Sequence, residues 1–280
     1  MRRRRRLGSP KDGPGKRGYR ADLSAENRGE GDRMLRDVDI EEISDGKFYL
    51  PDDMAPTGCG GCAGCSECCR NTGDSIILDP YDMYRLTVGI HRTFTDMIEK
   101  QIEIRLVDGL ILPNLMEHDE TQEDKEDGCP FLGGDGRCTI HAFRPSFCRM
   151  FPMGRYYPDP EELRQKGGQR FSGRTFVYIL QKEECPGRTG TPVLLRDWLD
   201  TPDLDAYEKF AADWHDFLRT AGQKTELLTG QSADQMRRYI LQVFYVQPYQ
   251  TGQDFYPQYA ARRKKVRETL APVLQAQGRN

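Results

Sequence analysis

The chain has 280 residues and nine cysteines, with 37% hydrophobic and 30% charged residues and a formal net charge of −3. Five of the cysteines lie within the eleven residues from Cys59 to Cys69, which excludes a generic soluble domain as the default interpretation. No segment approaches the roughly 18 consecutive apolar residues of a membrane helix, so we expect no membrane partner.

Positive charge is concentrated at the N-terminus. Residues 1–20 contain nine basic residues and one acid, so the rest of the chain is strongly acidic and unsuited to tracking nucleic acid. No apolar stretch of about 7–15 residues follows the arginine run, so the run is not a signal peptide. We interpret residues 1–33 as a disordered basic tail, and weak attraction to RNA is the alternative to a simply solvated segment.

These features predict a cytoplasmic protein, in which thiols stay reduced. Nine is also an odd number, which does not suit a closed set of disulfides. Ligation of a metal or a cluster is therefore favoured over disulfide bonding.

Short elements are predicted around the first cysteine cluster. Residues 47–50 and 75–78 have the apolar character of short strands. Asp79 and Pro80 predict the N-cap and first residue of a helix that Gly89 ends. Capping explains the acidic residues at this helix start better than catalysis does, and no catalytic dyad stands out elsewhere.

A second helix and a hairpin follow. Thr93 or Thr95 is expected to cap the helix, and apolar residues alternate on both sides of Asp108 and Gly109. That pattern predicts a β-hairpin with a type I′ turn. Residues 117–127 contain seven acids and one lysine and are read as a solvated loop.

The remaining cysteines come singly. Cys129 and Cys138 flank a glycine-rich turn at residues 133–136, which predicts a tight hairpin with one cysteine on each arm. Pro145 is expected to start a short helix that presents Cys148. A predicted strand at residues 176–180 then leads to Cys185.

The last third is predicted to be helical. Thr201 and Pro202 open one helix, Ser232 and Gln235 form the capping box of the next, and a third helix covers residues 255–275. The first of these helices places on one face the apolar residues Leu204, Tyr207, Phe210, Trp214, Phe217 and Leu218. His215 and the basic run at residues 262–267 are expected on solvated surfaces.

The predicted fold class is α+β. We expect a cysteine-cluster metal-binding domain at residues 34–200 and a helical extension at residues 201–280 that packs on it.

The first cluster has two-residue gaps between successive cysteines up to Cys68, and such gaps let two sulfurs reach one metal. Cys59, Cys62, Cys65 and Cys69 match the spacing of bacterial ferredoxins, although Arg70 stands where that motif has proline. Alternatively, a C-x2-C-x2-C-C unit is formed by the last four cysteines of the cluster, which are Cys62, Cys65, Cys68 and Cys69. The side chains of the adjacent Cys68 and Cys69 diverge, which indicates two metals or one cluster with a distal ligand.

The C-x2-C-x2-C-C unit resembles the signature of the YkgJ-type CxxCxxCC family, which is described as zinc- or iron-chelating. The blocks around Cys129, Cys138 and Cys148 resemble the family's second block, and the segment from Cys185 to Leu199 resembles its closing segment. The resemblance covers roughly residues 59–200 and implies metal chelation. Under it the metal ligands are Cys62, Cys65, Cys68, Cys69, Cys129, Cys138, Cys148 and Cys185, and Cys59 is an extra upstream candidate.

Many thiolates in one site require nearby positive charge. Arg70, Arg144 and Arg149 are the candidates for cofactor-binding cations, with structural ion pairing as the alternative for the last two. His141 stands where the family often has tyrosine. We read it as a polar residue beside the hairpin rather than as a ligand, because so many thiols leave a histidine unneeded.

Three functions remain open. The ferredoxin-like spacing and the all-sulfur donor set favour an iron–sulfur protein holding a 4Fe–4S cluster with a redox or supporting role. A structural or regulatory zinc module that contacts an unidentified protein partner is the second. The third is a protein-modifying enzyme, because flagellin lysine methylases carry a similar cysteine pattern; no glycine-rich loop suited to a methyl donor is present, and whether the chain is an enzyme stays open.

Overall fold

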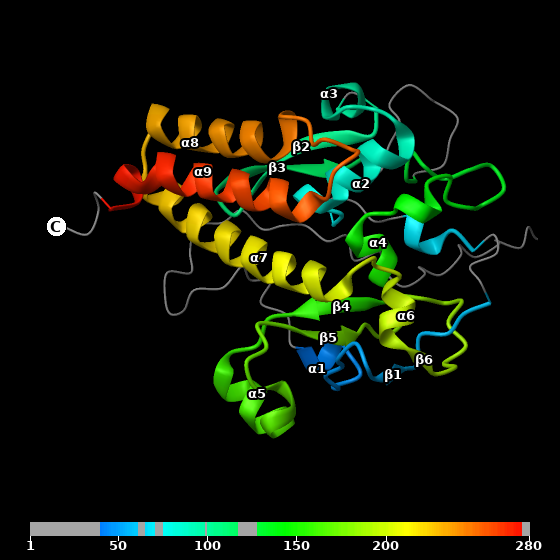
Figure 1. The fold of residues 1–280 in the computed structure, drawn as a ribbon. Coiled ribbons are helices and arrows are strands. Elements are labelled where there is room, and N and C mark those ends of the chain that lie inside the picture. The colour runs from blue at the N-terminus through cyan, green and yellow to red at the C-terminus, as the bar shows by residue number, and fades with distance from the viewer. Residues whose placement is uncertain (1–39, 61–64, 71–74, 99, 117–127, 276–280) are drawn as a thin grey trace, which may run out of the picture. The chain divides into compact units, whose positions relative to one another are not determined.

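The computed structural model describes residues 40–60, 65–70, 75–98, 100–116 and 128–275 (Figure 1). Their mixture of helices and short strands confirms the α+β class. They belong to one unit, Asp32–Asn280, and the predicted tail at residues 1–33 lies outside the described residues.

The strands of the described residues form three separate antiparallel pairs. β1 (Met54–Ala55) pairs with β6 (Val193–Leu194), β2 (Ile102–Val107) with β3 (Leu110–Leu115), and β4 (Met153–Tyr156) with β5 (Val177–Leu180). The helices are α1 (Ile40–Ile43), α2 (Pro80–Ile90), α3 (Phe94–Met97), α4 (Ser146–Met150), α5 (Pro160–Gly167), α6 (Leu195–Leu199), α7 (Leu204–Leu227), α8 (Gln231–Leu241) and α9 (Phe255–Gln275). Short 3-10 turns η1 (Glu67–Cys69), η2 (His141–Phe143) and η3 (Gly168–Phe171) and a π-turn η4 (Gln242–Val246) complete the described elements.

The predicted hairpin is confirmed. β2 and β3 are joined by Asp108 and Gly109, whose φ angles of 45° and 77° are those of a type I′ turn. The strand predicted at residues 176–180 is present as β5. The strands expected at residues 47–50 and 75–78 are reduced to single bridges, Tyr49 to Tyr178 and Ile77 to Asn114. The second cannot lengthen, because the N-cap of α2 follows directly.

Capping decides where the helices begin. Asp79 caps α2 and Thr93 caps α3, as predicted, and each forms a capping box with the acid three residues later. α2 continues past the expected stop at Gly89, because His91 supplies the left-handed residue that ends it, with φ of 53°. The acidic loop expected at residues 117–127 lies outside the described residues.

Two predicted helix starts in the last third are wrong. α7 begins at Leu204, where the side chain of Asp203 accepts the N–H of Ala206 at 3.2 Å, and not at Thr201. The capping box expected from Ser232 is absent, because α8 begins at Gln231 after a glycine N-cap without a side-chain hydrogen bond.

Helices α7, α8 and α9 lie side by side and carry much of the core (Figure 1). The six apolar residues predicted for one face of α7 are all buried, and the larger of two apolar clusters among the described residues extends from Tyr49 to Leu270. This cluster contains residues from both sides of residue 200, and the division into a metal-binding domain and a helical extension stays a prediction.

One residue of the basic run in α9 is not solvated. Arg262 is only 7% exposed and donates hydrogen bonds of 2.7–2.8 Å to the carbonyls of Val243, Gln247 and Pro248. Its guanidinium also lies 3.5 Å from the ring centroid of Tyr249. Burial is possible because the guanidinium satisfies the carbonyls at the end of η4, so the expectation of a solvated run is wrong at this position.

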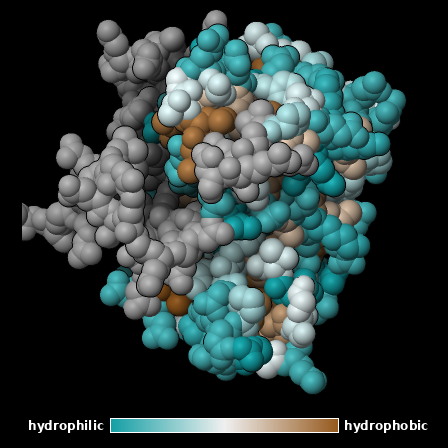
Figure 2. Space-filling view, turned by 90° about the vertical axis from the view of Figure 1, so that its left-hand side faces the viewer, coloured by the Kyte–Doolittle hydropathy of each residue, from teal (hydrophilic) through white to brown (hydrophobic). Residues whose placement is uncertain are grey.

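On the face shown in Figure 2, most of the described residues at the surface are hydrophilic. Among the described residues, no helix has both the length and the apolar content needed to cross a membrane.

Candidate metal centre

A backbone hydrogen bond joins the first cysteine cluster to the second. The N–H of Cys129 donates to the carbonyl of Cys69 at 2.8 Å, just before the glycine-rich turn. The turn itself is closed by the N–H of Gly133, which donates to the carbonyl of Arg137 at 2.8 Å, and by a bridge between Leu132 and Cys138. The predicted hairpin is thus a tight turn with one bridge, and it returns Cys138 toward Cys129.

The short helix α4 presents Cys148, and Pro145 is its N-cap, close to the predicted first position. The start of α4 is held by Asp82 of α2. One carboxylate oxygen accepts the N–H of Ser146 at 2.7 Å and the other accepts its hydroxyl at 3.1 Å. This second role of Asp82 has no signal in the sequence, because capping alone accounts for an acid at that position of a helix.

The turn η2, which lies between Cys138 and Cys148 in the chain, packs closely on α2. A Cβ added at Gly89 would lie 2.1 Å from a ring carbon of Phe143. Glycine at this position therefore allows the close approach that brings the cysteine-bearing segments together.

Five thiols act on one another electrostatically. Burial raises the pKa of Cys148, and the nearby Cys129, Cys68 and Cys138 raise it further. Burial also raises the pKa of Cys129 to about 11 and that of Cys138. A hydrogen bond between Cys68 and Cys69 lowers the pKa of the first to about 6 and raises that of the second. We call these five residues the main cysteine group.

This pattern fits a cation-binding site. Thiols that raise one another's pKa cannot all ionise without a compensating positive charge, and a bound metal supplies that charge. The donors are sulfurs, which suit zinc or iron.

Arg144 supplies part of the positive charge. Its guanidinium lowers the pKa of Cys68 and of Cys138, and it donates to the carbonyls of His141 at 3.1 Å and of Cys148 at 3.4 Å. Arg144 therefore lies within reach of three segments of the main cysteine group.

The other two candidate cations lie differently. Arg70 donates from Nε to the hydroxyl of Ser66 at 3.1 Å. Arg149 is buried, donates to the hydroxyl of Thr201 at 2.6 Å and lowers the pKa of Asp82, which burial raises. The described surroundings of Arg149 thus indicate that it offsets the charge of a buried carboxylate. Its predicted role in binding a cofactor stays a prediction.

A second set of cysteines lies near the turn at residues 185–188. Burial raises the pKa of Cys185, and Cys59, Cys65 and Cys68 raise it further. We call Cys59, Cys65 and Cys185 the second cysteine group. Cys62 lies outside the described residues, so its predicted role as a ligand stays a prediction.

No disulfide joins any two of the eight described cysteines. Within the described ranges, no three side chains of His, Cys, Asp or Glu are already arranged to hold a metal ion. The thiols are gathered but not organised around a common point, and ligation requires their side chains to turn inward.

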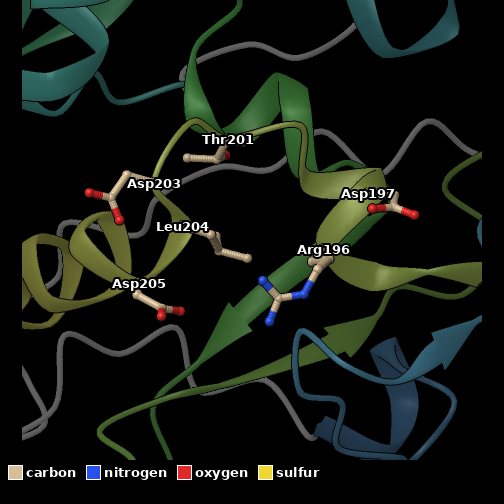
Figure 3. Close-up of a pocket in the computed structure, with 6 residues that line it drawn as sticks. All are labelled: Arg196, Asp197, Thr201, Asp203, Leu204 and Asp205. Carbon is tan, nitrogen blue, oxygen red and sulfur yellow. The ribbon is translucent and has the colours of Figure 1, made fainter.

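A cavity of about 360 Å³ lies near Arg149 but contains no described cysteine. Figure 3 shows Asp203 and Asp205 on one side of it and Arg196 and Asp197 on the other. Arg196 is paired with Asp52 at 2.6 Å. The cavity is therefore distinct from the cysteine groups.

The two histidines considered from the sequence, His141 and His215, have different surroundings. His141 is exposed in η2, as expected. His215 is half-buried, and its ring stacks on Tyr157 with centroids 3.5 Å apart and planes inclined by 8°. The expectation that His215 lies at the surface is therefore wrong, because an aromatic partner from outside α7 covers it.

Residues 61–172 match the model of the CxxCxxCC family, which is described as a "putative zinc- or iron-chelating domain". The match includes Cys62, Cys65 and the main cysteine group, and it leaves Cys59 and Cys185 outside. A search of curated proteins finds no match. A search of solved structures also finds none.

Proposed function

We propose, from the membership of residues 61–172 in the CxxCxxCC family, that this zinc- or iron-chelating domain holds an iron–sulfur cluster of the 4Fe–4S type. The observation that carries the proposal is the backbone hydrogen bond from Cys129 to Cys69, next to the turn that returns Cys138 toward Cys129, which gathers cysteines from separate segments. Such a cluster supplies one-electron transfer when it is bound. The chain is proposed to act in the cytoplasm, where the thiols stay reduced.

Residues of the main cysteine group would bind the cluster, and neighbouring residues would balance its charge and hold the segments in place. Sulfur ligands would come from three segments, through Cys69, Cys129, Cys138 and Cys148, and Cys68 adjoins Cys69 in the turn η1. Arg144 offsets thiolate charge. The bond from Cys129 to Cys69 and the contacts of Asp82 with Ser146 hold the segments in place.

Anaerobic purification followed by a visible spectrum and quantification of iron, sulfide and zinc tests this proposal. We expect a coloured protein with iron and acid-labile sulfide in similar amounts. A colourless protein with stoichiometric zinc and no sulfide would contradict the cluster and would favour the structural or regulatory zinc module.

Two cysteine variants test the ligand assignment. Cys148→Ala and Cys65→Ala should each lose metal and solubility together, because metal binding is coupled to folding. Wild-type metal content in either variant would remove that residue from the ligand set. For the methylase-like alternative, calorimetry with a methyl donor should show binding, and the absence of heat would count against it.

A further inference from the structure

Two segments far apart in the sequence are hydrogen-bonded at the second cysteine group. The N–H of Gly58 donates to the carbonyl of Thr191 at 2.9 Å, and the N–H of Thr189 donates to the carbonyl of Gly58 at 2.8 Å. Cys59 and Arg188 form the adjoining antiparallel bridge. The backbone therefore fixes Cys59 beside the segment that follows Cys185.

A turn brings Cys185 back toward this pairing. The N–H of Arg188 donates to the carbonyl of Cys185 at 3.2 Å, which closes the turn. Within it, a Cβ added at Gly187 would lie 3.6 Å from the sulfur of Cys65. Two cysteines of the first cluster and Cys185 thus meet at one turn.

The main cysteine group is held by a different set of contacts. The N–H of Cys129 donates to the carbonyl of Cys69 at 2.8 Å, and Cys148 lies on α4, whose start is held by Asp82. The backbone therefore gathers the described cysteines at two places, one at the turn after Cys185 and one between η1, the glycine-rich turn and α4.

We propose that Cys59, Cys65 and Cys185 hold a second metal centre, separate from the centre of Cys69, Cys129, Cys138 and Cys148. Two of its three ligands lie outside residues 61–172, so the family match does not include this centre. Three thiolates suit a soft or borderline metal such as zinc or iron. The metal draws the three sulfurs together, as expected where binding and folding are coupled.

This division rests on the proposed metal binding but is independent of which metal is bound. Cys62, outside the described residues, is not needed for the division. Iron, zinc and sulfide per chain are therefore measured together on the anaerobically purified full chain. Zinc in place of iron would overturn the iron–sulfur assignment. The division into two centres would then be tested by the zinc content of the same variants.

The decisive comparison uses two double variants, C59S/C185S and C138S/C148S. C59S/C185S is expected to lose the metal of the second centre and keep that of the main centre, and C138S/C148S is expected to show the reverse, because each removes ligands from one centre only. Loss of all metal from C59S/C185S with an unchanged circular dichroism spectrum would overturn the proposal, since the cysteines would then share one centre. Full retention of metal in C59S/C185S would also overturn it.

Thiol alkylation of the wild-type protein gives a second readout that does not depend on the variants folding. The protein is treated with increasing chelator, alkylated and analysed by mass spectrometry. Cys59, Cys65 and Cys185 should become reactive together, at a chelator concentration different from that for the other centre. If Cys185 becomes reactive together with Cys148 rather than with Cys59, the division into two centres is overturned.

Discussion

The carboxylate of Asp82 in α2 accepts both the N–H and the hydroxyl of Ser146, 64 residues further along the chain, at 2.7 and 3.1 Å. The same carboxylate accepts the N–H of Asp79 at 3.2 Å in the capping box. One buried side chain therefore fixes the start of α2 and the start of the helix that carries Cys148.

Asp82→Ala should lower the free energy of unfolding by about 2–4 kcal/mol, because buried donors at Ser146 and Asp79 lose their acceptor. Urea unfolding measures the change. Asp96→Ala is the matched control, since Asp96 forms an exposed capping box with Thr93, and its loss should lower the free energy of unfolding much less. Equal losses of unfolding free energy in the two variants would show that the hydrogen bonds from Ser146 to Asp82 do not stabilise the fold.

Gly89→Ala should destabilise the protein by about 1–3 kcal/mol, although alanine normally stabilises a helix interior by up to about 1 kcal/mol. The reason is the contact of the added Cβ with the ring of Phe143, at 2.1 Å. Thermal unfolding measures the effect. Gly252→Ala is the control, because nothing lies within 4 Å of a Cβ at that position. A more stable Gly89→Ala protein would contradict this packing.

Arg144→Gln should weaken metal retention by about 10- to 100-fold, the range expected for loss of a residue that supports metal ligands. The positive charge that favours ionised Cys68 and Cys138 is removed by this change. Competition with a chromophoric chelator measures retention. Arg144→Lys preserves the positive charge, so its metal retention should fall less than that of Arg144→Gln. Arg137→Gln, at an exposed arginine beside Cys138 in the sequence, should leave retention near the wild-type value.

His215 should make folding stability depend on pH. Its pKa is lowered to about 4, mainly by burial and also by the charges of Arg155 and Arg219, against the opposing charge of Asp216. Between about pH 4 and the unfolded value of about 6.5, the unfolded chain binds the proton and the folded chain does not, so stability falls as the pH falls.

His215→Gln removes this titration. The free energy of unfolding of the wild type should fall by about 1 kcal/mol more than that of the variant between about pH 7.5 and pH 5, after allowance for solvent screening of a half-buried ring. Release of metal at low pH is common to both proteins and cancels in the comparison. Parallel pH profiles would contradict the burial of this histidine against Tyr157.

Local signals in the sequence identified much of the fold. Asp79 and Thr93 cap their helices, Asp108 and Gly109 form the predicted turn, and the apolar face of α7 is buried. Each of these features depends on residues within one or two helical turns of one another. Ser232 did not cap α8, because the helix begins one residue earlier, at Gln231.

The sequence by itself determined that this chain is α+β and that residues 61–172 match the model of a zinc- or iron-chelating cysteine domain, because motif spacing and periodicity are local properties. Only the tertiary structure decided which described cysteines lie near which, that Asp82 holds Ser146, and that Arg262 is buried. These relationships join distant segments through specific hydrogen bonds and burial, and no spacing within one segment encodes them.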